Sequence, residues 1–252
     1  MLFRSAPLRP LASTYYNNRD HRKIVVIDGR VSFTGGVNLA DEYININSRF
    51  GHWKDAALMV EGEAVRSFTL LFLKMWSIDV REPDAFTAYL DASVPCAAPQ
   101  PGYVLPYADS PLDDEMITAL SSAAKRGVDV QIILPHIPDK KYAFALAKGH
   151  YRELLRAGVR IFEYTPGFVH AKVFVSDDIK AVVGTINLDY RSLYLHFENA
   201  VYLHGVPAIA DVETDFAATR ERCQEITHDD WKTNPFLTRV VAMLLRLFAP
   251  LL

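Results

Sequence analysis

Two short segments of the chain carry the same pattern of side chains that could do chemistry. Both read His-x-Lys-x4-Asp, followed at one shared offset by Gly-x-x-Asn. The residues are His21, Lys23, Asp28 and Asn38 in the first copy and His170, Lys172, Asp177 and Asn187 in the second. A single accidental His-x-Lys-x4-Asp pattern is expected about 0.02 times in a chain of this composition. Two copies with matching offsets therefore indicate an internal duplication.

The duplicated residues suit chemistry at the phosphorus of a phosphodiester. A neutral imidazole can attack phosphorus and form a covalent phospho-imidazole, which splits one displacement into two steps. A second imidazole can protonate the leaving oxygen and later deprotonate the acceptor hydroxyl. Lysines and asparagines can hold the non-bridging oxygens as charge builds, and Asp28 and Asp177 are expected to reach back and orient the imidazoles. Neither a His-Glu-x-x-His pattern nor a calcium-loop pattern occurs, so we expect no metal and no cofactor.

The segments that follow the histidines are typical of buried strands. Residues 24–27 and 173–175 are β-branched or aromatic, and Asp28-Gly29 is a hairpin signal that returns the chain through residues 31–34. We expect the second strand to begin at His170 itself. Because residues i and i+2 of a strand share a face, each histidine points the same way as its lysine. The chemistry requires the two strands to meet face to face, so that one phosphorus atom sits between two imidazole rings.

The remaining pattern predicts an α/β protein in two pseudo-symmetric lobes. Helical spacing occurs over residues 64–78, 116–126 and 151–157, and strands are predicted over residues 128–134 and 159–164. Helix, glycine and strand follow one another twice, which is typical of α/β units. Prolines gather between residues 91 and 111. We therefore predict a first lobe over residues 1–95, a linker over residues 96–111 and a second lobe over residues 112–252.

Composition limits the classes of partner. The 252 residues include 27 Lys and Arg against 30 Asp and Glu, for a net charge of −3, and 50% are hydrophobic. This balance argues against a disordered chain and against a generic nucleic-acid partner. Two cysteines at unrelated positions suggest neither a disulfide framework nor zinc. No apolar run reaches the length of a membrane-spanning helix, so we expect a soluble or surface-bound chain.

The motifs resemble those of the phospholipase D superfamily, and within it those of the bacterial cardiolipin synthases. The resemblance is carried by NRDHRKIVVIDGRVSFTGGVNLADEY and HWKDAALMVEG in the first half. In the second half it is carried by AAKRGVDVQIILP and by YRELLRAGVRIFEYTPGFVHAKVFVSDDIKAVVGTINLDYRSLYLHFENAVYL. It implies two phospholipase D-like α/β lobes with mixed sheets, and a transferase that joins two phosphatidylglycerol molecules into cardiolipin and releases glycerol. It implies Asn38, Asn187 and Glu198 in the substrate pocket. It leaves open which histidine is the nucleophile, and we take His21 as nucleophile and His170 as acid and base.

The resemblance also implies a membrane setting and two shortened lobes. The family pattern places further helices and strands before the first motif, and an extra helix and strand near PYADSPLDDEMITAL. We therefore expect both sheets to be incomplete, which would leave unpaired edges and exposed apolar surface. The expected partners are phosphatidylglycerol and an anionic membrane surface, with the chain peripheral on the cytoplasmic face of the cell membrane. A partner copy, as in a homo-oligomer, is one way to complete the site.

Two other functions remain open on these residues. The same double motif could serve a phosphodiesterase that hydrolyses lipid or cuts DNA, or the chain could be an inactive fragment. The other histidines share no spacing, and we interpret them as surface or core residues without a role in the site. They are His52, His136, His150, His196, His204 and His228.

Overall fold

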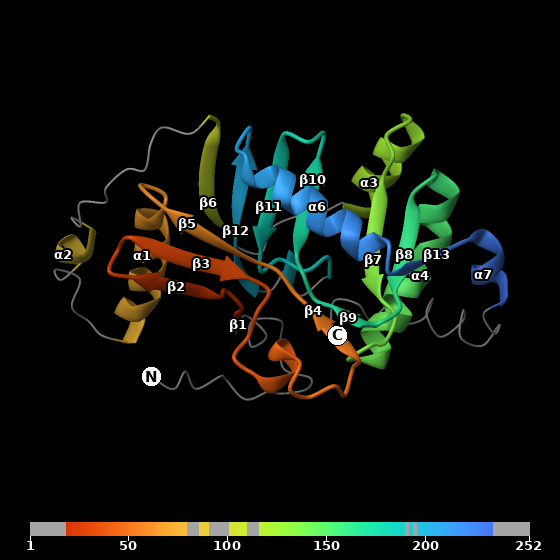
Figure 1. The fold of residues 1–252 in the computed structure, drawn as a ribbon, viewed down its shortest axis with the longest axis horizontal. Helices are drawn as coiled ribbons and strands as arrows, with labels where there is room; N and C mark the ends of the chain where they lie inside the picture. The colour runs from red at the N-terminus through yellow and green to blue at the C-terminus, as the bar shows by residue number, and fades with distance from the viewer. Residues whose placement is uncertain are drawn as a thin grey trace.

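Each histidine segment leads into a β-hairpin, and the two hairpins have the same build. The computed structural model describes residues 19–79, 86–90, 101–109, 116–189, 192–193 and 196–233 (Figure 1). The first hairpin pairs β2 (Ile24–Ile27) with β3 (Val31–Gly35), and the second pairs β10 (Val173–Ser176) with β11 (Lys180–Gly184). Both turns begin with two residues of positive φ, Asp28 and Gly29 in one and Asp177 and Asp178 in the other. Asp and Gly are residue types that tolerate this left-handed backbone, so the local sequence specifies each turn.

The duplication continues beyond the region where the two sequences visibly match. β5 (Ala57–Glu61) pairs antiparallel with β3, as β12 (His196–His204) does with β11. A glycine of positive φ follows each strand, and a helix follows each glycine, namely α1 (Val65–Asp79) and α6 (Ala208–Arg220). This alignment places Asp55, just before β5, in the position that Glu198 occupies on β12.

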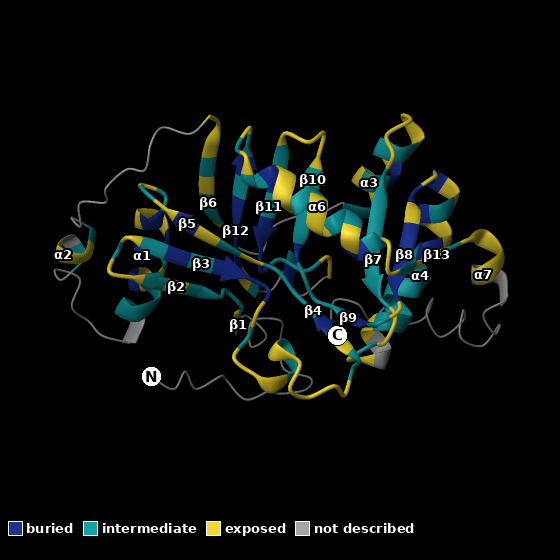
Figure 2. Cartoon of the chain, in the orientation of Figure 1, coloured by how far each residue is buried: buried dark blue, intermediate teal, exposed yellow. Residues whose placement is uncertain are grey.

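Strand pairing and a common hydrophobic core join the two halves. β4 (His52–Lys54) pairs in parallel with β9 (Gly167–Val169), and β1 (Arg19–Asp20) pairs with the first residues of β12. Buried side chains from β5 and α1 pack against those from β11, β12 and α6 in one cluster; its members are Val60, Val65, Phe68, Ala181, Val201, Leu203 and Ile209. Figure 2 shows buried residues along β3, β11 and β12, where the halves meet. The prediction of a mixed α/β fold is confirmed.

The rest of the second half forms a separate three-stranded sheet. Its strands are β7 (Gln131–Pro135), β8 (Arg160–Tyr164) and β13 (Cys223–Ile226), and its helices are α3 (Met116–Lys125), α4 (Lys141–Ala157) and α7 (His228–Thr233). Helix α4 ends at Gly158, whose φ of 96° caps it as the sequence predicted. Two short helical segments, η2 (Asp41–Ile44) and α2 (Phe86–Leu90), complete the described elements.

Several boundaries differ from the sequence-based prediction. β6 (Tyr103–Asp109) lies within the predicted linker of residues 96–111, yet pairs with β12 from Glu198 to His204. The prolines of this segment led to the prediction of a linker. A strand can nevertheless contain Pro106, because within the described residues β6 pairs with a neighbour along one edge, and proline is tolerated on such an edge strand. The strand expected from His170 begins at Val173, and the one expected from residue 128 begins at Gln131. Residues 1–18, 91–100, 110–115 and 234–252 of the predicted lobes and linker lie outside the described residues.

Both halves leave apolar surface uncovered. The three-stranded sheet β2-β3-β5 exposes about half of the side chains of Val25, Ile27 and Met59. In the second half, β10 and β7 are edge strands of different sheets, and an apolar cavity of about 290 Å³ is lined by residues of both. The cavity also reaches His170, Lys172 and Asn187. Among the described residues these strands offer unpaired edges, and the incompleteness of the two sheets stays a prediction.

Candidate active site

The two histidines occupy equivalent places at the start of the hairpins. The backbone N–H of His21 donates to the carbonyl of Phe197 at 3.0 Å, and that of His170 donates to the carbonyl of Lys54 at 2.7 Å. Each histidine is thus held by a residue that directly precedes a carboxylate, Glu198 after Phe197 and Asp55 after Lys54. In both copies the lysine ammonium donates to the carbonyl of its own motif histidine, at 2.7 Å for Lys23 and 2.6 Å for Lys172. The histidine and lysine of each motif lie before the strand and not on it, so this hydrogen bond, and not the alternation of a strand, links each lysine to its histidine.

A carboxylate from the opposite half holds each imidazole. His21 Nδ1 lies 3.0 Å from both Oε1 and Oε2 of Glu198, and His170 Nδ1 lies 2.8 Å from Oδ2 of Asp55. A carboxylate accepts, so the hydrogen bond assigns the proton to Nδ1 and leaves the lone pair on Nε2. Because the pairs cross between the halves, neither half can orient its own histidine.

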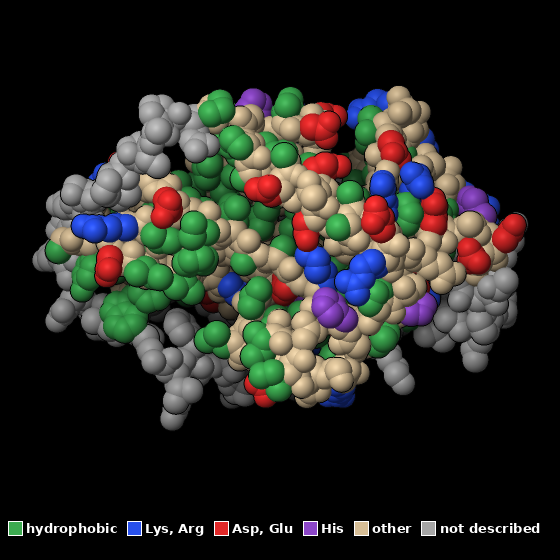
Figure 3. Space-filling view, in the orientation of Figure 1, with side chains coloured by type: hydrophobic (Ala, Val, Ile, Leu, Met, Phe, Trp, Pro, Cys, Tyr) green, Lys and Arg blue, Asp and Glu red, His purple; other side chains and the backbone are tan. Residues whose placement is uncertain are grey.

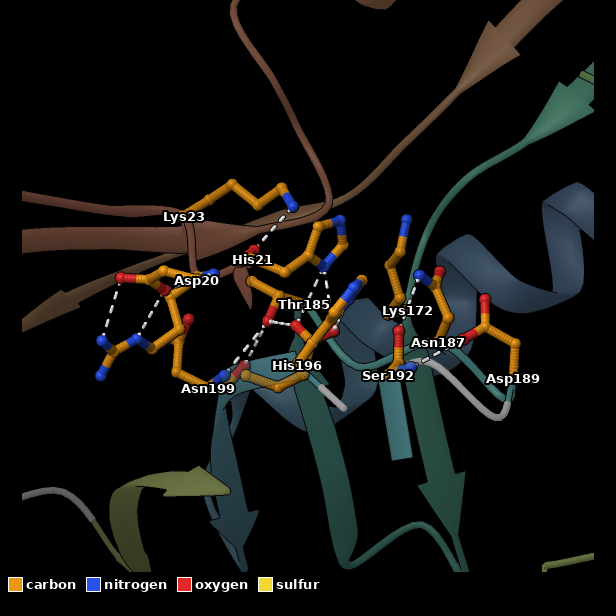
Figure 4. A network of polar contacts seen from close by, with 12 residues as sticks. Asp20, His21, Lys23, Lys172, Thr185, Asn187, Asp189, Ser192, His196 and Asn199 are labelled. Carbon is orange, nitrogen blue, oxygen red and sulfur yellow. Dashed lines mark hydrogen bonds and ion pairs between the residues drawn. The ribbon is translucent and has the colours of Figure 1, made fainter. Parts of the chain in front are cut away.

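Glu198 is fully buried among polar groups. The Thr185 hydroxyl donates to its carboxylate, and the Thr185 oxygen in turn accepts from the backbone N–H of Asn199 at 3.1 Å (Figure 4). Burial alone would raise the pKa of Glu198, but the neighbouring His196, His21 and Thr185 lower it to about 2. Glu198 is therefore ionised at neutral pH and can stabilise positive charge on the His21 ring.

Asp55 has a different setting. Burial would raise its pKa, but the hydrogen bond with His170 and the charge of Lys172 lower it below the ordinary value. The position that Thr185 holds in the second half is Gly36 in the first. A Cβ atom added at Gly36 would lie 2.1 Å from Asp55 Oδ1 and 2.8 Å from the His170 carbonyl, so only glycine leaves room for this carboxylate.

Aromatic side chains enclose His170. The ring centroids of Tyr43, Trp53 and Phe168 lie 5.3, 5.2 and 5.9 Å from that of His170. Burial lowers the pKa of His170, and the positive charges of Lys172 and Lys23 lower it further, against the raising effect of Asp55. The imidazolium of His170 is therefore a stronger acid than free imidazolium.

The two lysines belong to one electrostatic cluster. Burial lowers the pKa of Lys23 to about 8 and that of Lys172 to about 7, while Glu198 and Asp55 raise both. Lys23 also lowers the pKa of Lys172. Figure 4 shows the two lysine side chains on either side of the His21 ring. The two motifs thus meet in one site. Lys172 is buried there and Lys23 half-buried, and such ammonium groups gain stability when a phosphate enters.

The structure places the other predicted site residues as follows. Asp28 and Asp177 lie exposed in the hairpin turns, at the far ends of β2 and β10, so the expectation that they reach back to the imidazoles is wrong. Asn38 donates from its side chain to the Tyr43 hydroxyl, and Asn187 to the Ser192 hydroxyl at 3.1 Å. Both asparagines thus hold the loops that follow β3 and β11.

Two residues of the site were missed from the sequence. The sequence does carry a signal for Asp55, because the pattern Asp-x-Ala-x4-Gly that begins at Asp55 matches Glu-x-Ala-x4-Gly from Glu198. The separation of these two copies differs from that of the two histidine motifs, so the match is easily overlooked. His196 was assigned no role, yet its ring centroid lies 5.4 Å from that of His21 and its Nδ1 lies 3.7 Å from Glu198 Oε1. In the described part of the chain, His21, His196 and Glu198 are also the group whose ligand atoms could hold a metal ion, all within 4.8 Å of one another.

Comparisons with known proteins agree with this fold. Residues 103–220 match the family described as cardiolipin synthase, phospholipase D-like domain. A solved structure of phosphatidylserine synthase from Haemophilus influenzae Rd KW20 superposes with a TM-score of 0.64, covering 94% of this chain and 69% of that chain at 16% identity. The chain therefore has the phospholipase D-like fold.

The sequence relatives include cardiolipin synthases. An uncharacterized protein of Streptococcus mutans is 50% identical over 277 residues, covering 98% of this chain and 60% of the relative. Cardiolipin synthases of Geobacillus kaustophilus and Alkalihalophilus pseudofirmus are 36% and 34% identical, covering 98% and 96% of this chain but 55% and 54% of theirs. The chain is thus similar over nearly its whole length to cardiolipin synthases, and it spans a little over half the length of these relatives.

The alignments also bear on the predicted shortening. An alignment of 277 positions is longer than this chain of 252 residues, so the relatives carry residues inside the matched region that this chain lacks. The site of the predicted internal gap, near residues 110–115, lies outside the described residues. Among the described residues, none of the helices has the length and hydropathy needed to span a bilayer.

Proposed function

We propose that this chain is a phosphatidyltransferase that joins two phosphatidylglycerol molecules into cardiolipin and glycerol through a phosphohistidine. The observation that carries the proposal is the crossed pair of histidine–carboxylate contacts, His21 with Glu198 and His170 with Asp55. The contact at His21 leaves the Nε2 lone pair free to attack, and the half-buried Lys23 and the buried Lys172 provide positive charge beside the imidazoles. Known relatives described as cardiolipin synthases support the choice of substrate.

In the first half-reaction, His21 Nε2 attacks the phosphorus of one phosphatidylglycerol. The N–P bond forms as the bond from phosphorus to the glycerol oxygen breaks. His170, which carries a second proton on Nε2 when the phosphate is bound, gives that proton to the leaving oxygen and becomes neutral. Lys23 and Lys172 hold the non-bridging oxygens, where negative charge increases in the transition state. Loss of one such donor typically costs roughly 3–4 kcal/mol of barrier. Glu198 balances the positive charge that the His21 ring gains.

In the second half-reaction, His170 acts as base. It removes the proton from a glycerol hydroxyl of a second phosphatidylglycerol, whose oxygen attacks the phosphohistidine and breaks the N–P bond. Proton and charge then return to the starting state. Water in place of the second lipid would give phosphatidic acid, so transfer needs a site that favours lipid over water.

Apolar surface around the site supports a lipid substrate. The cavity of about 290 Å³ beside His170 and Lys172 is lined mainly by apolar side chains. The loop after β3 exposes Leu39 completely and most of Ile44 and Ile46, and Figure 3 shows apolar side chains gathered over this loop. Exposed apolar residues beside a phosphate site suit a peripheral enzyme at an anionic membrane surface.

Lipid analysis tests the proposed reaction. The purified chain is incubated with phosphatidylglycerol vesicles, and the products are separated and quantified. We expect cardiolipin and glycerol in equal amounts, and none from His21→Asn or His170→Asn. Phosphatidic acid as the main product would instead establish a hydrolase, and a folded chain without turnover would establish the inactive fragment.

Vesicle binding tests the membrane setting separately. Ile44→Asp with Ile46→Asp should weaken co-sedimentation with phosphatidylglycerol vesicles about tenfold or more, because each change removes apolar area from the interface. Asp177→Asn, in an exposed turn, is the matched control. Equal co-sedimentation of the double variant and the wild type would contradict the assignment of this loop.

A further inference from the structure

His196 is a buried imidazole beside the proposed nucleophile that the mechanism does not use. Its side chain is 11% exposed, and neither ring nitrogen makes a hydrogen bond within the described part of the chain. A buried imidazole without a hydrogen-bond partner is costly, so such a group calls for an explanation. Its ring packs against that of His21 with a centroid distance of 5.4 Å, and its Nδ1 points toward the carboxylate of Glu198.

The three side chains at this point form a set of metal ligands. His21 Nδ1 lies 3.0 Å and His196 Nδ1 lies 3.7 Å from Glu198 Oε1, and the three ligand atoms lie within 4.8 Å of one another. Ligand atoms around a tetrahedral zinc ion are about 3.3 Å apart when each metal–ligand distance is about 2.0–2.1 Å. Two imidazoles and one carboxylate are a ligand set that zinc uses with its fourth position open. Small side-chain rotations would therefore complete the geometry.

We propose that His21, His196 and Glu198 form a site for Zn²⁺ or a similar divalent transition metal, and that the bound metal inhibits the enzyme. Inhibition follows from which ring nitrogen of His21 holds the proton and which holds the lone pair. In the free site the His21 proton is on Nδ1 and the lone pair is on Nε2. A metal on Nδ1 takes the lone pair there and moves the proton to Nε2, so the nitrogen that must attack phosphorus no longer has a free pair. The inhibitory part rests on the proposed function, whereas metal binding does not.

The surroundings favour this half of the site over the other. Ring nitrogens of both His21 and His196 face the one carboxylate of Glu198. At the position equivalent to His196, the first half has Trp53, which packs against His170 but offers no ligand for a metal. The His170–Asp55 pair therefore lacks a third ligand there, and we expect one metal ion per chain.

Metal titration tests the binding site without any turnover. Calorimetry with Zn²⁺ and visible absorption with Co²⁺ should show one site per wild-type chain with an affinity in the micromolar range or tighter. His196→Asn should weaken binding at least tenfold and lose the Co²⁺ absorption. His204→Asn is the matched control, because His204 lies on the same strand β12 but stacks on Tyr103 away from the site. Thermal unfolding in metal-free buffer shows whether each variant folds.

Two further measurements separate the possible failures. If His196→Asn does not fold, imidazole nitrogen resonances of the wild-type chain replace it, and Zn²⁺ should shift those of two histidines and not those of His170. Wild-type protein that binds no Zn²⁺, or equal binding by the His196→Asn variant, would overturn the site. In the lipid assay Zn²⁺ should inhibit the wild type at least tenfold more strongly than His196→Asn. Binding without such inhibition would overturn the regulatory role alone, and an absence of turnover without metal would count against the proposed function instead.

Discussion

The two histidine–carboxylate pairs have equivalent positions in the fold but different surroundings. His21 and Glu198 lie among polar groups, with the Thr185 hydroxyl on the carboxylate and His196 beside both. His170 and Asp55 lie against Tyr43, Trp53 and Phe168, with Gly36 in the place of Thr185. The contact shared by both pairs, a carboxylate on Nδ1, is the one that acid–base or nucleophilic chemistry at Nε2 requires. The flanking residues are free to differ, and they give the two imidazoles different electrostatic environments.

This difference supports different roles for the two imidazoles. A nucleophile gains positive charge as it bonds to phosphorus, and the polar, ionised surroundings of His21 accommodate that charge. An acid must release a proton to the leaving oxygen, and the lowered pKa of His170 favours release. We therefore retain His21 as nucleophile and His170 as acid and base in the proposed mechanism.

The largest expected effect separates the roles of the two histidines. His21→Asn and His170→Asn should each lower turnover by roughly 10⁴-fold or more, since groups that act as a unit fail together. With a lipid whose leaving group needs no proton, such as a p-nitrophenyl phosphodiester, His170→Asn should still form a labelled phosphoenzyme, and His21→Asn should not. Labelling of the His21→Asn variant alone would reverse the assignment.

The second effect compares the two carboxylates. Glu198→Gln should lower kcat about 10³-fold and Asp55→Asn about 10²-fold, because an amide removes the charge that fixes the tautomer and stabilises the imidazolium. We expect the larger loss of kcat for Glu198→Gln because Glu198 contacts the proposed nucleophile, His21. Steady-state kinetics on vesicles measure both, with Asp28→Asn in an exposed turn as control. Equal losses for Asp28→Asn and Glu198→Gln would contradict the crossed arrangement.

The third effect distinguishes the two lysines by pH. Both ammonium groups must be charged to hold phosphate, and their pKa values are about 7 for Lys172 and about 8 for Lys23. The kcat/KM of the wild type should therefore begin to fall as pH rises through about 7. Lys172→Arg keeps its charge at high pH, so in this variant the fall should move to about 8, at reduced amplitude. Lys23→Arg should leave the fall near 7, and an unmoved profile in both variants would exclude the lysines as its cause.

The smallest effect concerns stability. A lysine whose pKa is lowered on folding binds its proton more tightly in the unfolded chain than in the folded one. The charged Lys172 therefore lowers the free energy of unfolding at pH 7. This destabilisation disappears as pH rises from the folded pKa of about 7 to the ordinary pKa of 10.5. Replacing the buried ammonium by an apolar side chain should raise the free energy of unfolding at pH 7 by on the order of 1 kcal/mol. Lys172→Met should gain more than Lys23→Met, since Lys172 is only 6% exposed. Urea unfolding at pH 7 and pH 10 measures both gains, and gains that do not shrink at pH 10 would contradict the electrostatic cause.

Much of this molecule follows from local sequence. The hairpins after His21 and His170 follow from β-branched runs and from Asp and Gly at the turns, and the end of α4 follows from Gly158. The strand β6 did not follow, because the prolines between residues 91 and 111 indicate a linker until β12 supplies a partner for β6. The roles of Asp28 and Asp177 were misassigned for a related reason. Sequence spacing places them near the histidines, whereas a four-residue extended strand carries each of them away.

The amino-acid sequence alone determined the residue types that do the chemistry, their duplication and the family that they resemble. Tertiary structure alone decided which carboxylate meets which histidine, because those contacts join residues more than one hundred positions apart and cross between the halves. It also decided that His196 lies beside His21, through the pairing of β1 with β12. Local patterns record backbone preference and burial, but the orientation of an imidazole depends on a partner that only the packed fold brings within hydrogen-bond distance.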